Sequence, residues 1–561
     1  MDFKKIIVEN LNCGFLTKEQ AYPMLGACAS LDMGDYCLPC FRFAKELKKS
    51  PQAIAEEMAK NVSSEYFTAE NVGGYVNFRL DRKFMAEKVL TEVYGGGESF
   101  KAEKPNGKTI CLDYSSINIA KPFHIGHLLT TAIGGSLYRI YKRLGYNVVG
   151  INHLGDWGTQ FGKMIVAFKK WGDRKDVEKR GVNALVELYV RFHKEAEENP
   201  KLDDEARAWF KKIEDGDKEA TELFKYFKAV TLEEVDKVYK RLGIEFDSYN
   251  GESFYNDKMD GVIETLKEKN LLKQSDGASI VDLSDYNMPP CLILRSDGAS
   301  LYATRDLAAA VYRKKTYDFD KNLYVVAYQQ NLHFKQVFKV LELMGCEWAE
   351  DCVHVPFGMV SLEGGGSLST RSGNVVYLSD VLDTAVEKAK KVIEEKNPDL
   401  NDKDKIAQQV GVGAVVFMAL STAKIKDLVF SYDKALSFEG ETAPYLQYTQ
   451  ARCRSVRVKC GEPKLENVDF SLLTDDAAAA VVTLLNRYDA VIRDAAEKYE
   501  PSLLAKYLID LAQSYNAFYV DHRIAGEREE VTKARLMLSE CVRKTLKDGL
   551  NLLLIESPDK M

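Results

Sequence analysis

Residues 109–155 read TICLDYSSINIAKPFHIGHLLTTAIGGSLYRIYKRLGYNVVGINHLG, and this stretch predicts the fold of the molecule. Its two ends, TICLDYSS and YNVVGINHLG, are rich in apolar and β-branched residues, which is typical of buried strands. Between them, six aliphatic side chains recur at helical spacing: Leu128, Leu129, Ile133, Leu137, Ile140 and Leu144. Gly145 is positioned to end that helix. Because strand, loop, helix and strand form the unit of a parallel sheet with right-handed crossovers, we expect an α/β protein with a Rossmann-like core.

The loop that leads into this helix, residues 117–127, has the composition of a phosphate site. In a parallel sheet, ligands bind beyond the carboxyl ends of the strands, where the free N–H groups of the next helix attract phosphate. His124 and His127 offer ring N–H donors, and Lys121 offers a mobile positive charge. Gly126 would let a nucleotide approach the backbone closely. The same residues also fit a histidine pair that only caps and packs the start of the helix, and the loop by itself leaves both interpretations open.

The length of 561 residues allows roughly three or four domains. Residues 1–105 combine helical patterns with the strand-like GGYVNFRL and predict a small α+β domain. Residues 106–385 predict the Rossmann-like core, in which a charged helical insertion occupies the region near 164–250. After the insertion, strand signals of the split sheet resume in PCLILRSDGASLYATRD and LYVVAYQQNLHF. Residues 386–561 carry only helical patterns, so we expect an all-α helical bundle there.

The overall composition is that of a globular protein, with 46% hydrophobic and 29% charged residues. The net charge of −7 does not favour nucleic-acid binding by the molecule as a whole, so such binding would need a local basic surface. No apolar run approaches the roughly 18 residues of a membrane span, and MDFKKIIVEN lacks the apolar segment of a signal peptide. We therefore expect no membrane contact and a cytoplasmic location.

The cysteines point to the same compartment. Eleven cysteines without regular spacing are typical of reduced thiols rather than of a disulfide framework. Cys37 and Cys40 in CLPC lack a second pair or a nearby histidine that would complete a zinc site. We interpret this pair as structural and expect no metal site in the protein.

Several motifs along the chain resemble those of one enzyme family. SSINIAKPFHIGH and NHLGDWGTQFG are similar to the ATP-binding region of class I aminoacyl-tRNA synthetases, and they fall on the expected strand and helix ends. LYATRDLAAA, QQNLHF, STRSGNVV and FEGETAPYLQYTQAR extend the match over nearly the whole chain. Together they resemble the arginyl-tRNA synthetases.

This resemblance implies an arginine–tRNA ligase that uses ATP and Mg²⁺. In such enzymes the carboxylate of L-arginine attacks the α-phosphate of ATP, and the acyl group then passes to the 3′ end of tRNA(Arg). Charge develops on phosphoryl oxygens, so fixed donors and cations around them supply most of the catalysis. The resemblance assigns ATP binding in the first motif to five residues: Asn118, Lys121, His124, Gly126 and His127. Lys121, His124 and His127 are the expected catalytic residues of this motif.

A second ATP loop of these synthetases matches GGGSLSTRSGNVV, and here the chain departs from the common pattern. Ser367 and Thr370 stand where lysines are usual, which leaves Arg371 as the cation of the loop. The resemblance implies that Ser369, Thr370 and Arg371 contact ATP, with Arg371 catalytic. We hypothesise that Lys121 and Arg371 share the stabilisation of charge.

Selection of arginine requires acceptors that match a planar guanidinium, and carboxylates suit it best. By resemblance, the acids are Asp113, at the end of the first core strand, and Asp306 in YATRD. Tyr302 precedes Asp306 by four residues, so both can face one pocket if the segment is helical. The remaining positions that the resemblance assigns to the arginine substrate are Asn118, His153 and Gln330.

Two regions match the tRNA-binding surfaces of the family. Tyr445, Tyr448 and Arg452 recur at helical spacing and form an aromatic and cationic stripe on which RNA bases can stack, at the start of the expected anticodon-binding domain. In the N-terminal domain, Tyr75 and Asn77 match positions that contact the tRNA elbow. Both tyrosines of the helical stripe could equally be core residues with polar tips.

Two other functions remain as alternatives. A synthetase-like RNA-binding protein with impaired catalysis would be expected to lose the first motif or the substrate acids, and all are present. A small-molecule adenylyltransferase would share the histidine motif but would have no use for a large C-terminal helical domain. We expect the protein to act as a monomer with L-arginine, ATP and tRNA(Arg) as its partners.

Overall fold

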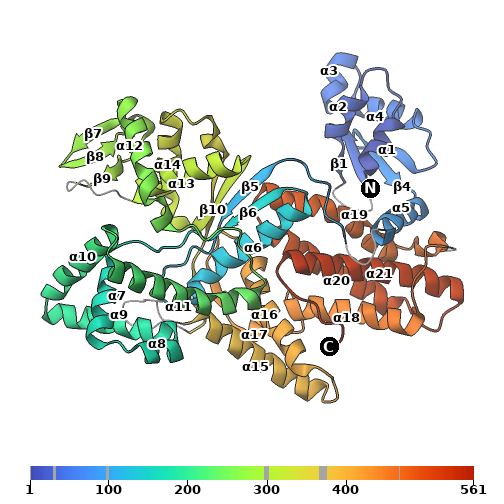
Figure 1. Cartoon of the computed structure of the whole chain (residues 1–561). Helices are drawn as coiled ribbons and strands as arrows, with labels where there is room; N and C mark the ends of the chain where they lie inside the picture. The colour runs from blue at the N-terminus through green and yellow to red at the C-terminus, as the bar shows by residue number, and fades with distance from the viewer. Residues whose placement is uncertain (1, 29–32, 96–99, 296–301, 365–375, 467) are drawn as a thin grey trace.

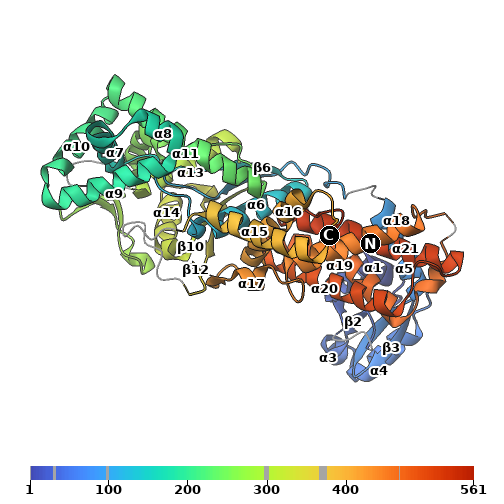
Figure 2. The same ribbon diagram turned by 90° about the horizontal axis from the view of Figure 1, so that it is seen from below.

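The computed structural model describes residues 2–28, 33–95, 100–295, 302–364, 376–466 and 468–561. A parallel sheet with its covering helices lies at the centre of the molecule (Figure 1). A lobe of insertion helices and a lobe with a small antiparallel sheet lie on one side of this centre, and the N-terminal domain and the C-terminal helices lie on the other. The molecule is elongated when seen from below (Figure 2).

The N-terminal domain is built on a four-stranded antiparallel sheet in the order β1-β2-β4-β3. Val76, Phe78 and Leu80 of β4 are buried against its helices. The elements are α1 (Phe3–Glu9), α2 (Lys18–Met24), β1 (Gly26–Ala27), β2 (Tyr36–Pro39), η2 (Phe41–Phe43), α3 (Ala44–Leu47), α4 (Pro51–Lys60), β3 (Phe67–Val72), β4 (Tyr75–Leu80) and α5 (Arg82–Gly95). This arrangement confirms the expected α+β unit.

The central sheet has four parallel strands in the order β11-β10-β5-β6. Helices cover both faces, which explains why the strand sequences are continuously apolar rather than alternating. The Thr130 hydroxyl donates to the carbonyl of Val325 at 2.7 Å and so fixes the first helix against the sheet. The elements of this core are β5 (Thr109–Asp113), η3 (Ile125–His127), α6 (Leu128–Arg143), β6 (Asn147–Ile151), α13 (Tyr302–Tyr317), β10 (Lys321–Ala327), η6 (Tyr328–Gln330), α14 (Asn331–Leu343), η7 (Glu347–Asp351), β11 (Cys352–Phe357) and β12 (Val360–Leu362).

The stretch that predicted the fold has the expected structure. β5, α6 and β6 form a strand–helix–strand unit, in which β5 and β6 pair in parallel. Gly145 follows the helix with φ 77°, and a Cβ there would lie 2.3 Å from the carbonyl oxygen of Lys104. Glycine is therefore required at this helix end both by conformation and by space.

Two lobes are inserted between β6 and β10. The first is helical, as expected, and consists of α7 (Thr159–Trp171), α8 (Arg174–Arg180), α9 (Val182–Glu198), α10 (Lys201–Glu214) and α11 (Lys218–Leu242). The second contains η4 (Glu252–Lys258), α12 (Met259–Glu268), β7 (Leu272–Ser275), β8 (Ala278–Val281), η5 (Ser284–Tyr286) and β9 (Cys291–Leu294). The strand signal at 290–294 belongs to an antiparallel sheet, β7-β8-β9, and not to the central parallel one. Short apolar runs look alike in either sheet, which is why the sequence did not separate them.

The C-terminal region is a helical bundle with one exception. Its elements are α15 (Leu378–Lys396), α16 (Lys403–Ser421), β13 (Leu428–Phe430), α17 (Tyr432–Ala435), α18 (Ala443–Cys460), η8 (Phe470–Leu473), α19 (Asp476–Glu497), α20 (Ser502–Asp521) and α21 (Glu529–Leu552). The strand β13 pairs in parallel with β12, so the expectation that everything after residue 385 is helical is wrong at this point. Three residues between helices are too short to give a periodic signal.

The two ends of the chain pack together. Helix α5 of the N-terminal domain lies against α19 and α21 (Figure 1). The buried Lys544 ammonium donates to the carbonyls of Val93 and Tyr94, at 2.6 and 2.9 Å, and so caps the end of α5. The N-terminal domain is thus attached to the bundle rather than tethered by a linker alone.

Candidate active site

The candidate residues gather at one edge of the central sheet. The strand order reverses between β5 and β10, and ligands of open α/β sheets bind at such a switch point, outside the carboxyl ends of the strands. Asp113 ends β5, His153 lies two residues beyond β6, and Gln330 ends the turn that follows β10. Tertiary structure therefore brings together residues that are far apart in the chain.

The loop after β5 has an unusual backbone. Ser115, Ser116 and Ala120 have φ values of 67°, 44° and 58°, which non-glycine residues adopt only when their surroundings hold them there. The Ser115 hydroxyl is hydrogen-bonded to Tyr239 of α11 at 2.8 Å, and the Ala120 N–H donates to the hydroxyl of Thr231 at 3.1 Å. The insertion helix α11 thus supports this loop.

Asn118, which is exposed, lies directly against the loop that follows β6. It forms a parallel bridge with Gly155, and a Cβ on Gly155 would come within 2.4 Å of the Asn118 Oδ1 atom. The absence of a side chain at Gly155 therefore allows Asn118 to stand at the mouth of the site. The sequence match did not single out Gly155, because its role depends on a contact between two loops.

The turn that contains His124 and His127 fits both interpretations that the sequence left open, a cap of the helix start and a phosphate site. His124 caps the turn, since its Nδ1 accepts the N–H of Gly126 at 3.0 Å. The two imidazole rings contact each other at a tilt of 41°, with centroids 4.1 Å apart. A Cβ on Gly126 would lie 2.7 Å from the ring of His124, so no other residue fits beneath that ring. With Nδ1 of His124 accepting, the neutral ring carries its proton on Nε2, which remains a donor for a ligand.

Both rings are neutral near pH 7. Burial lowers the pKa of His127 to about 3, with further lowering by the nearby charges of His124 and Lys121. Burial also lowers the pKa of His124, and Lys121 adds to this effect. The turn can therefore offer N–H donors to a phosphate, while positive charge comes from the Lys121 ammonium.

Val376, the first described residue after the second predicted ATP loop, is hydrogen-bonded to the histidine turn. The Ile125 N–H donates to the carbonyl of Val376 at 3.0 Å, and the N–H of Leu378 donates to the carbonyl of Phe123 at 3.0 Å. The segment 376–378 thus lies beside the first motif. Ser369, Thr370 and Arg371, together with Ser367, lie outside the described residues.

Asp113 is a buried carboxylate that the chain itself already pairs. Its Oδ2 accepts from Nη2 of Arg313 in α13 at 2.7 Å, and its Oδ1 accepts from the Ser116 hydroxyl at 2.7 Å. Arg313 also lies 3.4 Å from Nδ1 of His153, whose ring stacks on Tyr255. A guanidinium can only donate, so it fixes His153 with an acceptor at Nδ1. Burial lowers the pKa of His153, which keeps that ring neutral.

Asp306 is the second predicted acid, and its environment differs. Its Oδ2 lies 2.6 Å from Nε2 of His333, and its Oδ1 accepts no hydrogen bond from the described part of the chain. Burial opposes ionisation of Asp306, but the hydrogen bond from His333 and the positive charge of Arg313 act against it, and the net effect lowers the pKa of Asp306. The carboxylate is therefore ionised and has one oxygen available for a cationic ligand.

Tyr302 and Asp306 stand one turn apart in α13, which confirms that the YATRD segment is helical. Tyr302 is the first described residue of this helix, and 69% of its surface is exposed. Gln330 is also exposed, beyond the end of β10. Both side chains are open to solvent at the mouth of the site rather than packed in the core.

Two charged residues that the sequence analysis did not select belong to the same site. Arg305 forms an ion pair with Glu252 at 3.2 Å, and both are largely buried. Burial raises the pKa of Glu252 to about 7; Arg305 and Lys121 act against this effect, while Asp306 adds to it. Glu252 thus stands within electrostatic range of both Lys121 and Asp306. Arg305 could have been found from its place in the YATRD motif, whereas Glu252 has no signal besides its tertiary position.

The helical stripe of α18 is divided between core and surface. Tyr445 is half-buried, and its hydroxyl accepts from Asn516 at 2.9 Å. Tyr448 is 43% exposed, and the Arg452 guanidinium lies 5.0 Å from its ring and 5.1 Å from that of Tyr519. The alternative of a core residue therefore fits Tyr445, whereas Tyr448 and Arg452 present a flat surface of rings and guanidinium.

The two residues predicted at the tRNA elbow also differ. Tyr75 is 39% exposed and packs edge-on against Phe41, with ring centroids 5.1 Å apart. Asn77 is only 4% exposed, and its Nδ2 donates to the carbonyl of Met33 at 2.9 Å. Tyr75 is available to a ligand as it stands, while Asn77 lies beneath the segment that contains Met33.

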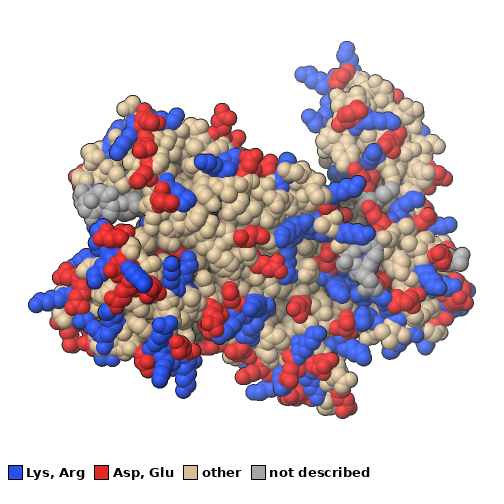
Figure 3. Space-filling model, in the orientation of Figure 1, with Lys and Arg blue, Asp and Glu red and all other residues tan. Residues whose placement is uncertain are grey.

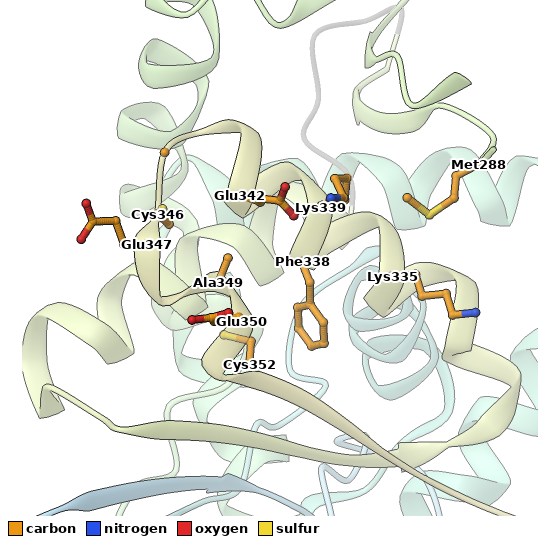
Figure 4. A pocket seen from close by; sticks show the side chains of 11 residues that line it. Met288, Lys335, Phe338, Lys339, Glu342, Cys346, Glu347, Ala349, Glu350 and Cys352 are labelled. Carbon is orange, nitrogen blue, oxygen red and sulfur yellow. Dashed lines mark hydrogen bonds and ion pairs between the residues drawn. The ribbon is translucent and has the colours of Figure 1, made fainter. Parts of the chain in front are cut away.

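A groove of about 800 Å³ lies away from these residues. It is bordered by Phe338 and Glu342 of α14, by Cys346 and Glu350, and by Cys352 at the amino end of β11 (Figure 4). The reactive edge of a parallel sheet is the carboxyl one, so this groove is not part of the candidate site. In the ranges that the structure describes, no group of three or more histidine, cysteine, aspartate or glutamate side chains is placed to hold a metal ion.

Three family comparisons cover most of the chain. Residues 90–432 match the family described as tRNA synthetases class I (R), catalytic domain. Residues 446–561 match the DALR anticodon binding domain, and residues 1–80 match the arginyl tRNA synthetase N terminal domain.

Whole-chain relatives agree with these matches. The chain is 50% identical over 565 residues to the arginine–tRNA ligase of Alkaliphilus metalliredigens, and the aligned region covers 100% of both proteins. It is 51% identical over 549 residues to the arginine–tRNA ligase of Clostridioides difficile, with 97% of each covered. The arginyl-tRNA synthetase structure of Thermus thermophilus superposes with a TM-score of 0.81 at 27% identity and covers 96% of each chain.

Proposed function

Since the chain belongs to the arginyl-tRNA synthetase family and is an ATP-dependent arginine–tRNA ligase, we propose that L-arginine and ATP react between Asp306 and the histidine turn. The observation that carries this proposal is a series of contacts between the two halves of the site. Asn118 bridges Gly155, and Asp156 beside it accepts from the N–H of Ser253 at 2.8 Å. Glu252, the neighbour of Ser253, pairs at 3.2 Å with Arg305, which precedes Asp306. Substrates bound at these two positions would lie close enough for one to activate the other.

ATP would bind at the amino end of α6. The Nε2–H groups of His124 and His127 would donate to phosphate oxygens, and Lys121 would neutralise the charge that develops when the arginine carboxylate attacks the α-phosphate. Pyrophosphate then leaves, and arginyl-adenylate remains. Gly126 keeps the backbone accessible, and Asn118 would orient the substrate at the mouth of the site. Ser369, Thr370 and Arg371 stay predictions for the second ATP loop, with support from the attachment of Val376 beside the first motif.

Mg²⁺ would be held chiefly by the nucleotide. The described part of the chain offers no cluster of three or more protein ligands, which suits a cation that keeps several waters and binds through substrate phosphates. When bound, it would neutralise phosphate charge. With or without the ion, residues of the protein would position both substrates.

Arginine would be selected mainly by Asp306. Its Oδ1 accepts from no described residue and would be the acceptor for the guanidinium, whereas both oxygens of Asp113 already accept from Arg313 and Ser116. We therefore assign Asp306 to direct contact with the guanidinium and Asp113 to positioning the pocket through Arg313 and His153. Tyr302 and Gln330 remain the proposed contacts at the mouth of the pocket. A neutral analogue such as citrulline would leave Asp306 without a counter-charge.

The second step requires tRNA(Arg), whose terminal ribose hydroxyl takes the acyl group. We propose that Tyr448 and Arg452 stack on bases of the anticodon loop and that Tyr445 positions them through Asn516. Tyr75 would contact the elbow, with Asn77 ordering the segment around Met33. On the face drawn in Figure 3, basic and acidic side chains are interspersed, so such contacts would rely on local groups rather than on one broad basic surface.

Three further expectations belong to the same proposal. We keep the division into domains at residues 1–105, 106–385 and 386–561, a monomeric state and a cytoplasmic location. Among the helices that the structure describes, none is both long and apolar enough to cross a membrane.

ATP–pyrophosphate exchange across the amino acids, with and without tRNA(Arg), tests the proposal. We expect exchange with arginine alone, and by resemblance to the family we expect it to require tRNA. Exchange with none of the amino acids while tRNA still binds would instead favour an RNA-binding protein with impaired catalysis.

A further inference from the structure

The N-terminal domain contains a pair of thiols that the ligase reaction does not use. Strands β1 and β2 are antiparallel, with Gly26 opposite Cys37, and the N–H of Cys28 continues the pairing to the carbonyl of Asp35 at 3.2 Å. Cys28 therefore points to the same face as Cys37, at a diagonal position. Both thiols are partly exposed. The Cys37 thiol donates to the carbonyl of Ala27, the residue before Cys28, at 3.8 Å, and the Cys28 thiol donates to the carbonyl of Met33 at 3.8 Å.

Cys37 does not face its sequence neighbour in CLPC. Cys40 lies three residues further along, is fully buried, and its thiol packs 3.8 Å from the sulfur of Met58. Cys37 and Cys40 of CLPC therefore do not face each other, and the pairing of strands gives Cys37 a different neighbour, Cys28. Only the fold reveals this pair.

We propose that Cys28 and Cys37 form a reversible disulfide when the protein meets hydrogen peroxide. The bond would join the end of β1 to β2, next to the proposed elbow-binding strand β4, and this consequence rests on the proposed function. Cys37 is opposite Asn77 in the β2–β4 register, and Asn77 donates to Met33, between the two cysteines in the chain. A disulfide would therefore hold Cys28 to strand β2 beside Asn77.

The chemistry assigns different roles to the two sulfurs. Burial, and after it the charge of the neighbouring Cys37, raise the pKa of Cys28 to about 11, so Cys28 keeps its proton and donates its S–H to the carbonyl of Met33. The Cys37 thiolate attacks peroxide, the O–O bond breaks, and a sulfenic acid and one water form after proton uptake. The Cys28 sulfur then attacks the Cys37 sulfur, the S–O bond breaks, and the second water leaves with the Cys28 proton. Two thiols are oxidised by two electrons, and one peroxide is reduced.

The geometry favours a bond that can be reversed. Diagonal residues of paired strands have Cα atoms about 7–8 Å apart, whereas disulfides usually need about 4.4–6.8 Å, so closure requires a small shift of the end of β1. Disulfides under such strain are reduced more easily than relaxed ones, as regulatory disulfides are.

The test treats the full-length protein with peroxide, followed by alkylation and peptide mapping without reductant. We expect a Cys28–Cys37 crosslinked peptide that disappears with dithiothreitol. Cys28→Ser and Cys37→Ser should each abolish it, while Cys460→Ser, at a half-buried thiol elsewhere, should not. Melting curves check that the variants fold. Crosslinks confined to other cysteines, or a Cys37 that is only overoxidised in the wild type, would overturn the proposal.

A second measurement separates this pair from the proposed elbow contact. The KM for tRNA should rise several-fold in the oxidised wild type, return after reduction, and stay unchanged by peroxide in Cys37→Ser. A crosslink without this rise would overturn the link to tRNA binding while supporting the modification site. Tyr75→Ala tests the elbow contact itself in the reduced protein, so failure of that contact is recognised independently.

Discussion

The carboxylate of Asp113 and the guanidinium of Arg313 form an ion pair of 2.7 Å between two residues that are both nearly inaccessible to solvent. Asp113 ends the strand β5, and Arg313 lies in α13, so the pair ties the sheet to the helix that carries Asp306. The substrate of the enzyme is itself a guanidinium. The protein therefore pairs one of its two predicted substrate acids with its own arginine, whereas Oδ1 of the other, Asp306, accepts from no residue in the described ranges.

Removing Arg313 should destabilise the protein strongly. Arg313→Met leaves the Asp113 carboxylate buried without its counter-charge, which typically costs roughly 3 to 5 kcal/mol. Urea denaturation and thermal melting measure the loss. The double variant Asp113→Asn with Arg313→Met should recover part of it, because no unpaired charge remains. Equal losses in the single and double variants would contradict this account of the pair.

Asp306→Asn should raise the KM for arginine far more than the KM for ATP. The variant loses the ionised acceptor for the guanidinium, and loss of one partner of a desolvated charge pair costs about 2 to 5 kcal/mol. Steady-state kinetics with each substrate varied in turn would measure this. Asp318→Asn, at an exposed aspartate in an ion pair with Lys314, is the matched control and should change neither constant. Parallel changes in both constants for Asp306→Asn would argue against the assignment.

Lys121→Ala should reduce turnover by about 100- to 1000-fold while arginine binding changes little, as for other donors that act on the transition state. ATP–pyrophosphate exchange in the presence of tRNA measures the rate. Lys108→Ala removes an exposed lysine that precedes β5 at the opposite edge of the sheet and serves as the control. An adenylation rate near that of the wild type in Lys121→Ala would leave Arg371 as the more important cation.

His127 should make the protein less stable in mild acid. Its folded-state pKa of about 3 lies below the ordinary value of 6.5, because burial disfavours the charged ring. The unfolded chain therefore binds a proton that the folded chain does not, and stability falls as pH decreases below about 6.5 toward the folded pKa. His127→Asn removes this contribution. As pH falls below about 6.5, the difference in the free energy of unfolding between wild type and variant should therefore decrease by up to about 1.4 kcal/mol for each pH unit.

Denaturation curves at pH 7, 6 and 5 would be used for this comparison. A gap between wild type and His127→Asn that stays constant over this range would show that the ring is not held neutral.

Tyr448→Ala should weaken tRNA binding without changing arginine activation. Loss of one stacked base is worth about 1 to 3 kcal/mol, and Tyr448 presents its ring beside Arg452 on the surface of α18. Filter binding and the KM for tRNA(Arg) measure the effect. Tyr445→Phe removes only the hydroxyl that accepts from Asn516 and should have a smaller effect. If Tyr448→Ala bound tRNA as the wild type does, the stripe would have a structural role only.

The sequence was sufficient for much of the fold because the relevant signals are local. The apolar periodicity of residues 109–155 predicted β5, α6 and β6, and Gly145 ends α6 with a positive φ as expected. The histidine turn could also be located, since capping and ring contact involve residues no more than three positions apart. The strand β9 was placed in the wrong kind of sheet and β13 was missed, because strand partners are chosen by residues distant in the chain.

The sequence by itself determined which segments form strands and helices and that a phosphate loop follows β5, since these depend on neighbours along the chain. The tertiary structure alone decided that Arg313 pairs with Asp113 and that no described residue donates to Oδ1 of Asp306. It also decided that Glu252 pairs with Arg305 and that Cys28 and Cys37 share one face of paired strands. These relationships depend on burial and on distances between residues that are far apart in the chain. Charge and hydrogen-bond interactions are set by such distances, and a linear pattern does not contain them.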